Sequence, residues 1–194
     1  MHQFQVTIDF LKELRPPPWV LTAIIPDGHT TTVTVHTVEE TIAFLGRHNG
    51  KQNLYYTLNA TRTAMSKKPK KADIVAVEYL HADLDPADGE SPDDAKARYL
   101  GQLNGSFEPP PTWIVDSGGG IQAGWQMDEP IGLEGDDREA LVAEAENRSK
   151  ALMLRLGSEA GTQNIDRILR LPGTINIPNA KKLIRVVSLA PRLS

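Results

Sequence analysis

The chain has 194 residues, of which 40% are hydrophobic and 24% charged, as in an ordinary soluble globular domain. It contains no apolar run of about 18 residues and no basic segment followed by an apolar one at its start, so we expect no membrane span and no signal peptide. The lack of cysteine excludes disulfides and thiolate zinc sites. We therefore expect a cytoplasmic protein without a membrane partner.

The net charge of -4 is unevenly distributed along the chain. Basic residues outnumber acidic ones in residues 1–71 and again in 150–194, whereas acids dominate residues 72–149. The two basic segments could fold into one face that binds a phosphate backbone, or the charge could be scattered over a solvated surface. The sequence leaves both interpretations open.

The first third of the chain has the patterns of two helices and three strands. They are a helix at 1–15, strands at 19–25 and 30–36, a helix at 37–47 and a strand at 53–59. Pro16 ends the first helix, and Pro26-Asp27-Gly28 is typical of a hairpin turn between the first two strands. The second helix opens with a capping box, Thr37 to Glu40. Arg62 lies in a polar turn, and a basic segment follows at 66–71.

The rest of the chain predicts strands and helices without regular alternation, which favours the α+β class. They are strands at 75–85, 112–116, 121–126, 164–171 and 183–189, and helices at 91–103 and 136–156. Ser91, followed by proline and acids, is a good helix start, and Gly157 is a helix stop. No repeat and no convincing linker divides the chain, so we expect a single domain over residues 1–194.

Two carboxylates stand at the end of the strand at 75–85. Because strand side chains alternate between faces, Asp83 and Asp85 point the same way, while Leu80, Ala82 and Leu84 turn to the opposite face. Two like charges this close repel each other unless a cation or a proton lies between them, and hard oxygen ligands favour Mg²⁺ or Mn²⁺. The alternative is a strand that simply runs into a polar turn.

Two later segments carry compatible chemistry. Residues 117–122, Ser-Gly-Gly-Gly-Ile-Gln, place a glycine turn between two strands, where backbone N–H groups can bind an anion. Asp166 is a third carboxylate close to Arg167 and Arg170, whose guanidinium groups suit phosphate. Metal-dependent phosphoryl or nucleotidyl transfer requires such acids and anion donors. Taken singly, the glycine run is equally typical of an ordinary hairpin turn, and Asp166 could be an ordinary ion-pair partner of arginine.

The order and wording of these segments resemble the catalytic domain of the archaeo-eukaryotic primase (AEP) superfamily, especially primase-polymerase and RepB-like primase domains of plasmids and phages. The resemblance depends on residues 80–86 (LHADLDP), 116–125 (DSGGGIQAGW) and 166–176 (DRILRLPGTIN), preceded by 53–59 and Arg62. It covers about residues 50 to 180. It implies an α+β fold with an RRM-like antiparallel or mixed sheet flanked by helices, with an N-terminal subregion at about 1–70 and the RRM-like subregion at 71–194.

The resemblance also implies a DNA primase or polymerase that transfers nucleotides from (d)NTPs to a primer or an initiating nucleotide in replication of a mobile element or phage. Its partners would be a single-stranded DNA template, a primer and nucleoside triphosphates, with a helicase or a helical primase domain elsewhere in the system. A non-catalytic nucleic-acid-binding replication module and a metal-dependent nuclease are the alternatives.

Carried over by residue, the resemblance makes Asp83, Asp85 and Asp166 the catalytic acids that bind Mg²⁺ or Mn²⁺. The expected nucleotide-binding residues are Ser117, Gly118, Gly119, Gln122 and Arg170, and the expected nucleic-acid contacts are Asn59, Arg62, Lys67 and Lys68. Many members carry histidine where this chain has Gln122. Glutamine can donate a hydrogen bond to phosphate but brings no positive charge.

Overall fold

The computed structural model describes residues 4–25, 28–105, 107–177 and 185–190. Its helices are α1 (Gln5–Leu14), α2 (Val38–His48), α3 (Pro92–Asn104) and α4 (Arg138–Arg155), with a 3-10 turn at Lys71–Asp73. Its strands are β1 (Trp19–Ile24), β2 (Thr30–Val35), β3 (Asn53–Thr57), β4 (Ala60–Thr61), β5 (Ile74–Leu84), β6 (Trp113–Asp116), β7 (Ile121–Gly132), β8 (Ile168–Arg170), β9 (Ile175–Asn176), β10 (Arg185–Val186) and β11 (Ser188–Leu189).

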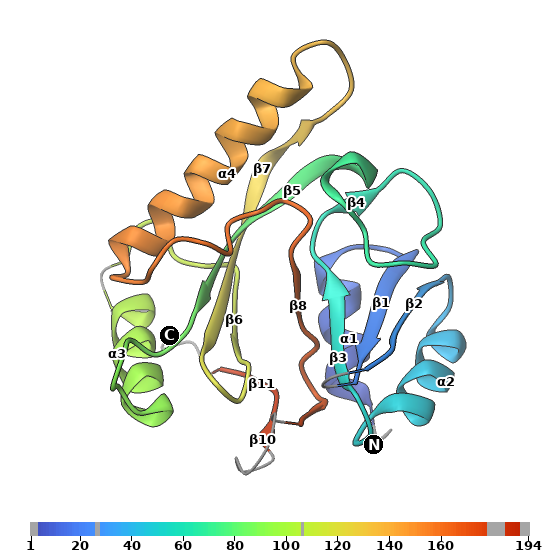
Figure 1. Cartoon of the computed structure of the whole chain (residues 1–194), viewed down its shortest axis with the longest axis horizontal. Helices are drawn as coiled ribbons and strands as arrows, with labels where there is room; N and C mark the ends of the chain where they lie inside the picture. The colour runs from blue at the N-terminus through green and yellow to red at the C-terminus, as the bar shows by residue number, and fades with distance from the viewer. Residues whose placement is uncertain (1–3, 26–27, 106, 178–184, 191–194) are drawn as a thin grey trace.

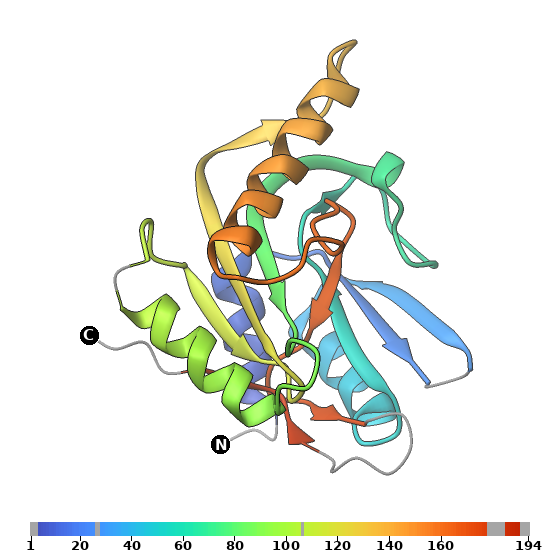
Figure 2. The same ribbon diagram turned by 60° about the vertical axis from the view of Figure 1, so that its left-hand side comes forward.

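These strands form two main antiparallel sheets, which we call the first and the second sheet. The first has the order β2-β1-β3-β8 and the second β11-β6-β7-β5-β4, with a small pair β10-β9 beside them. Helices α3 and α4 lie on the side of the second sheet that faces away from the first sheet (Figures 1 and 2). The fold is therefore a mixed α+β domain with antiparallel sheets, as the sequence predicts.

The succession β5-α3-β6-β7-α4-β8 is the β-α-β-β-α-β order of ferredoxin-like and RRM-like units. Its last strand leaves the second sheet, however, because β8 pairs with β3 of the first sheet. In Figure 1, β8 runs between β5 and β3. The strand within the third predicted motif thus belongs to the first sheet and lies beside the end of β5.

Three apolar clusters are buried among the described residues, and the two larger ones hold these layers together. The larger unites α1 and both sheets, with Phe10, Tyr56, Trp113 and Leu169 among its buried members. The second lies beneath α3 and α4, where Leu84 and other residues of β5 and β7 pack against the helices. Because burying apolar side chains is the main favourable term in folding, these clusters fix how the sheets face each other.

The predicted helix ends are confirmed. The Thr37 hydroxyl accepts from the Glu40 backbone N–H at 3.1 Å, and the Ser91 hydroxyl accepts from that of Asp94 at 3.1 Å. Gly157 follows α4 with a φ of 71°, the left-handed conformation that glycine adopts most easily. No helix in the described part of the chain combines the length and the apolar character needed to cross a bilayer.

Three strand predictions differ from the structure, and the first is the strand expected at 121–126, which continues as β7 to Gly132. The strand expected at 164–171 begins only at Ile168, because Asp166 lies in a turn whose Asn164 side chain donates to the Asp166 carboxylate at 2.7 Å. The strand expected at 183–189 lies partly outside the described residues, and its remainder forms β10 and β11, which pair with different neighbours. Pro26 and Asp27 of the predicted hairpin turn also lie outside the described residues.

Candidate functional site

Asp83 occupies the end of β5, on the face of the second sheet that looks toward β8. It lies directly across from Gln122 of β7 in the ladder, and the Gln122 side-chain amide donates to Asp83 Oδ1 at 3.0 Å. The amide oxygen of Gln122 accepts from the backbone N–H of Arg170 in β8 at 3.0 Å. Gln122 therefore links the two sheets through its side chain, and this contact uses both ends of the amide.

The second oxygen of Asp83 has a charged partner. Arg167, just before β8, places Nη2 2.5 Å from Asp83 Oδ2, and the Asp83 side chain is only 11% exposed. A nearly buried carboxylate needs such a partner, because an unpaired charge in the interior is costly. Both Asp83 oxygens thus have donors, one from each neighbouring motif.

Asp85 follows β5 and joins Asp83 on one wall of a cavity. Burial raises the pKa of the Asp85 carboxyl, and the charge of Asp83 raises it further, while Arg167 and Arg170 lower it. On the opposite face of β5, Ala82 and Leu84 pack under the helices, as the alternation predicts. Two carboxylates that repel each other fit a divalent cation, which would relieve the repulsion.

Asp166 directly precedes Arg167 in the chain, but its carboxylate has a different partner. It accepts from Asn164, whereas its neighbour Arg167 makes the contact with Asp83. Within the ranges that the structure describes, no three acidic, histidine or cysteine side chains are gathered closely enough to hold a metal ion. The three-acid metal site therefore stays a prediction.

The glycine turn between β6 and β7 packs against the end of β5. The Ser117 hydroxyl accepts from the Gly120 N–H and donates to the Gly120 carbonyl, both at 3.0 Å, so it closes the turn. A Cβ on Gly120 would lie 2.3 Å from the Leu84 carbonyl oxygen and 3.3 Å from the Asp85 Cα. Only glycine permits this approach, which brings the turn next to the acid pair.

The other two glycines of the turn differ in their surroundings. Gly118 has a φ of 87° and donates its backbone N–H to the Asp116 carboxylate at 2.8 Å. Asp116 is also bound by the Lys96 ammonium at 2.9 Å. Nothing lies within 4 Å of a Cβ built on Gly119, so its backbone borders open space. Gly119 is thus the glycine of the turn that a ligand can approach.

Arg170 lies on the first sheet opposite the acids. Its guanidinium carbon is 4.5 Å from the centre of the Tyr55 ring, and Tyr55 is its partner in the β3–β8 ladder. Its Nη1 is buried and has no hydrogen-bond partner. Burial lowers the pKa of Arg170, although Tyr55 and the two acids oppose this. A buried guanidinium with an unused donor is suited to an anion.

The residues expected to contact nucleic acid lie in different environments. Asn59 is 2% exposed, accepts from the backbone N–H groups of Glu78 and Tyr79, and donates to the Ile165 carbonyl. It holds the irregular part of β5 in place, so the expectation of a nucleic-acid contact does not agree with its burial. Arg62, by contrast, is exposed and pairs with Glu134 at 3.2 Å.

Lys67 and Lys68 are exposed on the basic segment at 66–71. Both side chains are open to solvent, so a phosphate backbone could reach them. Their role as nucleic-acid contacts stays a prediction.

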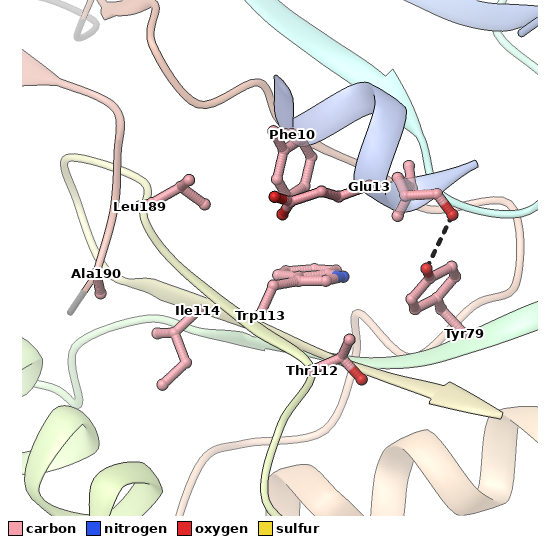
Figure 3. A pocket seen from close by; sticks show the side chains of 9 residues that line it. Phe10, Glu13, Tyr79, Thr112, Trp113, Ile114, Leu189 and Ala190 are labelled. Atoms are coloured by element: carbon pink, nitrogen blue, oxygen red, sulfur yellow. Dashed lines mark hydrogen bonds between the residues drawn. The ribbon is translucent and has the colours of Figure 1, made fainter. Parts of the chain in front are cut away.

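Several cavities border the sheets, and one of them contains the acid pair. One, of about 210 Å³, is lined by the acid pair, Tyr99 and the chain that follows α4. The larger, of about 280 Å³, lies between α1 and β6, where Phe10 and Trp113 face each other and Tyr79 donates to the Leu14 carbonyl at 2.9 Å (Figure 3). None of the predicted site residues lines the larger cavity.

Two contributors to the site were not among the residues predicted for it. The sequence indicates only that the Arg167 guanidinium suits phosphate, and its pairing with Asp83 joins residues 84 positions apart. Tyr55 holds Arg170 through a cross-strand contact. No local pattern reports either pairing, although an arginine directly after Asp166 was a usable signal for Arg167.

The topology, with an acid pair on β5, a glycine turn against it and arginines at β8, defines the class of the fold. The chain has the fold of archaeo-eukaryotic primase-polymerase catalytic domains, which confirms the resemblance seen in the sequence. One similar solved structure is titled "Cyanophage S-2L Primase-Polymerase (PrimPol), AEP domain (PP-N190)". The alignment covers 99% of this chain and 91% of that one, with a TM-score of 0.64 and 16% sequence identity.

A second solved structure, titled "Crystal structure of primase RepB'", has a TM-score of 0.59 and 15% identity. Here the alignment covers 98% of this chain and 56% of that one. No protein-family model matches the sequence. A search of curated proteins also finds no match. At these identities the likeness establishes the fold.

Proposed function

We propose that this chain is a DNA primase or polymerase that adds nucleotides from (d)NTPs to a primer or an initiating nucleotide on a single-stranded DNA template. The observation that carries the proposal is the acid pair, Asp83 and Asp85, facing two arginines across the junction of the sheets. This pair stands within a fold shared with a primase-polymerase and a primase.

In this proposal Asp83 and Asp85 hold Mg²⁺ or Mn²⁺, with Asp166 as a third acid. The bound cation would supply positive charge that activates a 3′-hydroxyl and stabilises the leaving pyrophosphate. Gln122 orients the Asp83 carboxylate through its hydrogen bond. Arg170 offers its unpartnered Nη1 to the triphosphate, and the open backbone at Gly119 lets the phosphates approach the turn.

The cyanophage source of one structural neighbour supports a role in replication of a phage or another mobile element. A helicase or a helical primase domain would then act with this chain in the same system. Arg62, Lys67 and Lys68 are exposed, and we propose that they contact the backbone of the nucleic acid.

The test is a gel assay with a primed single-stranded template, (d)NTPs and Mn²⁺ or Mg²⁺. We expect extension by the parent chain, none after chelation with EDTA, and at least about a 100-fold loss in the double variant Asp83→Asn with Asp85→Asn. The matched control is Asp128→Asn with Glu129→Gln, which removes two exposed acids of β7 that have no predicted role.

The assay also separates the alternatives, since a nuclease would shorten the strands and a non-catalytic replication module would leave them unchanged. If the double variant extends primers like the parent, the assignment of the acid pair is wrong. Circular dichroism of each variant would show whether a loss of activity follows from unfolding.

A further inference from the structure

Arg167 occupies the position on Asp83 that a metal ion would need. Its Nη2 lies 2.5 Å from Asp83 Oδ2, and Gln122 already donates to Oδ1. Each carboxylate oxygen has two lone pairs, so a cation bound at Oδ2 would either share that oxygen with the guanidinium or displace it. The guanidinium is the partner that competes directly, since it and a metal ion are both positive.

Arginine keeps its charge at every accessible pH, so Arg167 can leave Asp83 only by moving. Its position permits this. Arg167 precedes β8, its side chain is 31% exposed, and its Nε is buried without a hydrogen-bond partner. A single strong contact therefore holds the guanidinium, and among the described residues no second side chain hydrogen-bonds it.

Arg170 provides the contrast. Its backbone lies in the β3–β8 ladder, its N–H is bound by Gln122, and its guanidinium stacks on Tyr55 without a hydrogen bond to Asp83. Of the two arginines beside the acids, Arg170 is the fixed one and Arg167 the one that can exchange partners.

We propose that Arg167 is the counterion of Asp83 in the metal-free protein and gives up Oδ2 when a divalent cation binds. Its freed guanidinium then pairs with the triphosphate that arrives with the cation. Arg167 thus keeps the buried carboxylate neutralised before binding and becomes a phosphate ligand afterwards. This inference deepens the proposed function and rests on it.

The first measurement is Mn²⁺ binding to the whole chain without nucleotide or DNA, followed by the electron paramagnetic resonance of free Mn²⁺. We expect Arg167→Gln to bind Mn²⁺ about tenfold more tightly than the parent, because the competing charge is gone. Arg167→Lys keeps a competing charge and should stay near the parent. The control Arg148→Gln removes the same charge from an exposed pair on α4 and should change the affinity less than about twofold.

The second measurement uses a non-hydrolysable dNTP analogue at saturating Mn²⁺. Here Arg167→Gln should bind the analogue about tenfold more weakly than the parent, with partial rescue by Arg167→Lys. Opposite changes for metal and nucleotide from one substitution distinguish a change of partners from a structural contact, which would weaken both.

An unchanged or weaker Mn²⁺ affinity in Arg167→Gln overturns this inference while leaving the metal site in place. An unchanged affinity for the analogue overturns the transfer of Arg167 to the triphosphate. If neither the parent nor Arg167→Gln binds Mn²⁺, the proposed metal site itself fails, and the inference fails with it.

Discussion

Among single residues, Asp85 is one whose ionised form is disfavoured in the folded chain. Burial and the neighbouring Asp83 both raise the pKa of its carboxyl, and the two arginines only partly offset this. The folded state therefore binds a proton at Asp85 more tightly than the unfolded state does. Above the usual aspartate pKa of 3.8, Asp85 ionises readily in the unfolded chain but is disfavoured as an anion in the folded one. The free energy of unfolding therefore falls as the pH rises from 3.8 through the raised pKa of the folded state.

We therefore expect Asp85→Asn to stabilise the protein at pH 7. The gain should be at most about 1 kcal/mol, because Asp85 is exposed on one side and water screens the repulsion. It should shrink as the pH falls and vanish below 3.8, where the native carboxyl is also neutral. Urea unfolding at pH 7 and below pH 3.8 measures both values. A loss of stability at pH 7 would contradict the repulsion, and Asp128→Asn controls for a change in net charge.

The same substitution is expected to impair nucleotidyl transfer. Functional sites often contain groups that lower the stability of the folded state but are needed for activity. The residue scale thus supplies an argument for a cation site that does not depend on the fold comparison, because burial and the neighbouring Asp83 both disfavour the ionised Asp85 carboxylate.

At the scale of elements, the turn between β6 and β7 places the second motif against the first. Gly120 lies so close to the end of β5 that a Cβ would meet the Leu84 carbonyl oxygen at 2.3 Å, a backbone atom that cannot move aside as a side chain would. Gly119, its neighbour, borders open space. Of these two adjacent glycines, Gly120 has no room for a side chain, whereas Gly119 does.

Gly120→Ala should destabilise the protein by about 1–3 kcal/mol, because the added methyl group forces the turn away from β5. Gly119→Ala should change stability by less than about 1 kcal/mol in either direction, since the methyl group meets no atom and only backbone freedom changes. Urea denaturation of the two variants compares them directly. Equal losses in both would mean that the turn does not pack against β5 as described.

The elements also show what local sequence can predict. The caps at Thr37 and Ser91 and the alternation around Asp83 depend on neighbours within four residues, and the structure agrees with them. Asp166 was expected within a strand because the apolar residues after it dominate the pattern. Its turn is closed by the Arg167 backbone N–H, which donates to the Asn164 carbonyl at 3.0 Å, and by the Asn164 side chain, which donates to the Asp166 carboxylate; such local bonds compete with strand pairing.

The side-chain contacts between the two sheets could not be predicted from neighbouring residues in the sequence. Gln122 was expected to face phosphate, whereas its amide bridges Asp83 and the backbone of Arg170. Arg167 reaches Asp83 only because β8 leaves the second sheet to pair with β3. The chemistry of the site was therefore predictable from local motifs, but the partners of each side chain follow from a topology that no local pattern specifies.

For the whole molecule, the pairing of β8 with β3 has a consequence for stability. The predicted N-terminal subregion contributes β1 and β3, and the later part contributes β6 and β8, to one apolar cluster. Leu169 of β8 is 0% exposed in that cluster, between the sheets. Neither part can bury its own apolar face without the other, so the two should unfold together.

We expect urea unfolding to be a single transition, although the chain is longer than the 150 residues or so below which two-state behaviour is usual. Tryptophan fluorescence reports on both sheets, because Trp19 lies in the first and Trp113 and Trp125 in the second, all three buried. Its midpoint should coincide with that of far-ultraviolet circular dichroism. Separate midpoints would show that the two parts fold independently.

Leu169→Ala sharpens this test. Removing a fully buried leucine should cost about 2–5 kcal/mol and shift both probes by the same amount, since the cluster belongs to both sheets. The control Leu154→Ala, at a side chain 56% exposed on α4, should shift them by less than about 0.5 kcal/mol. If Leu169→Ala lowered only one midpoint, the junction that brings Arg167 and Arg170 to the acid pair would have to be stabilised by one sheet alone, and the shared cluster would not explain how the site is assembled.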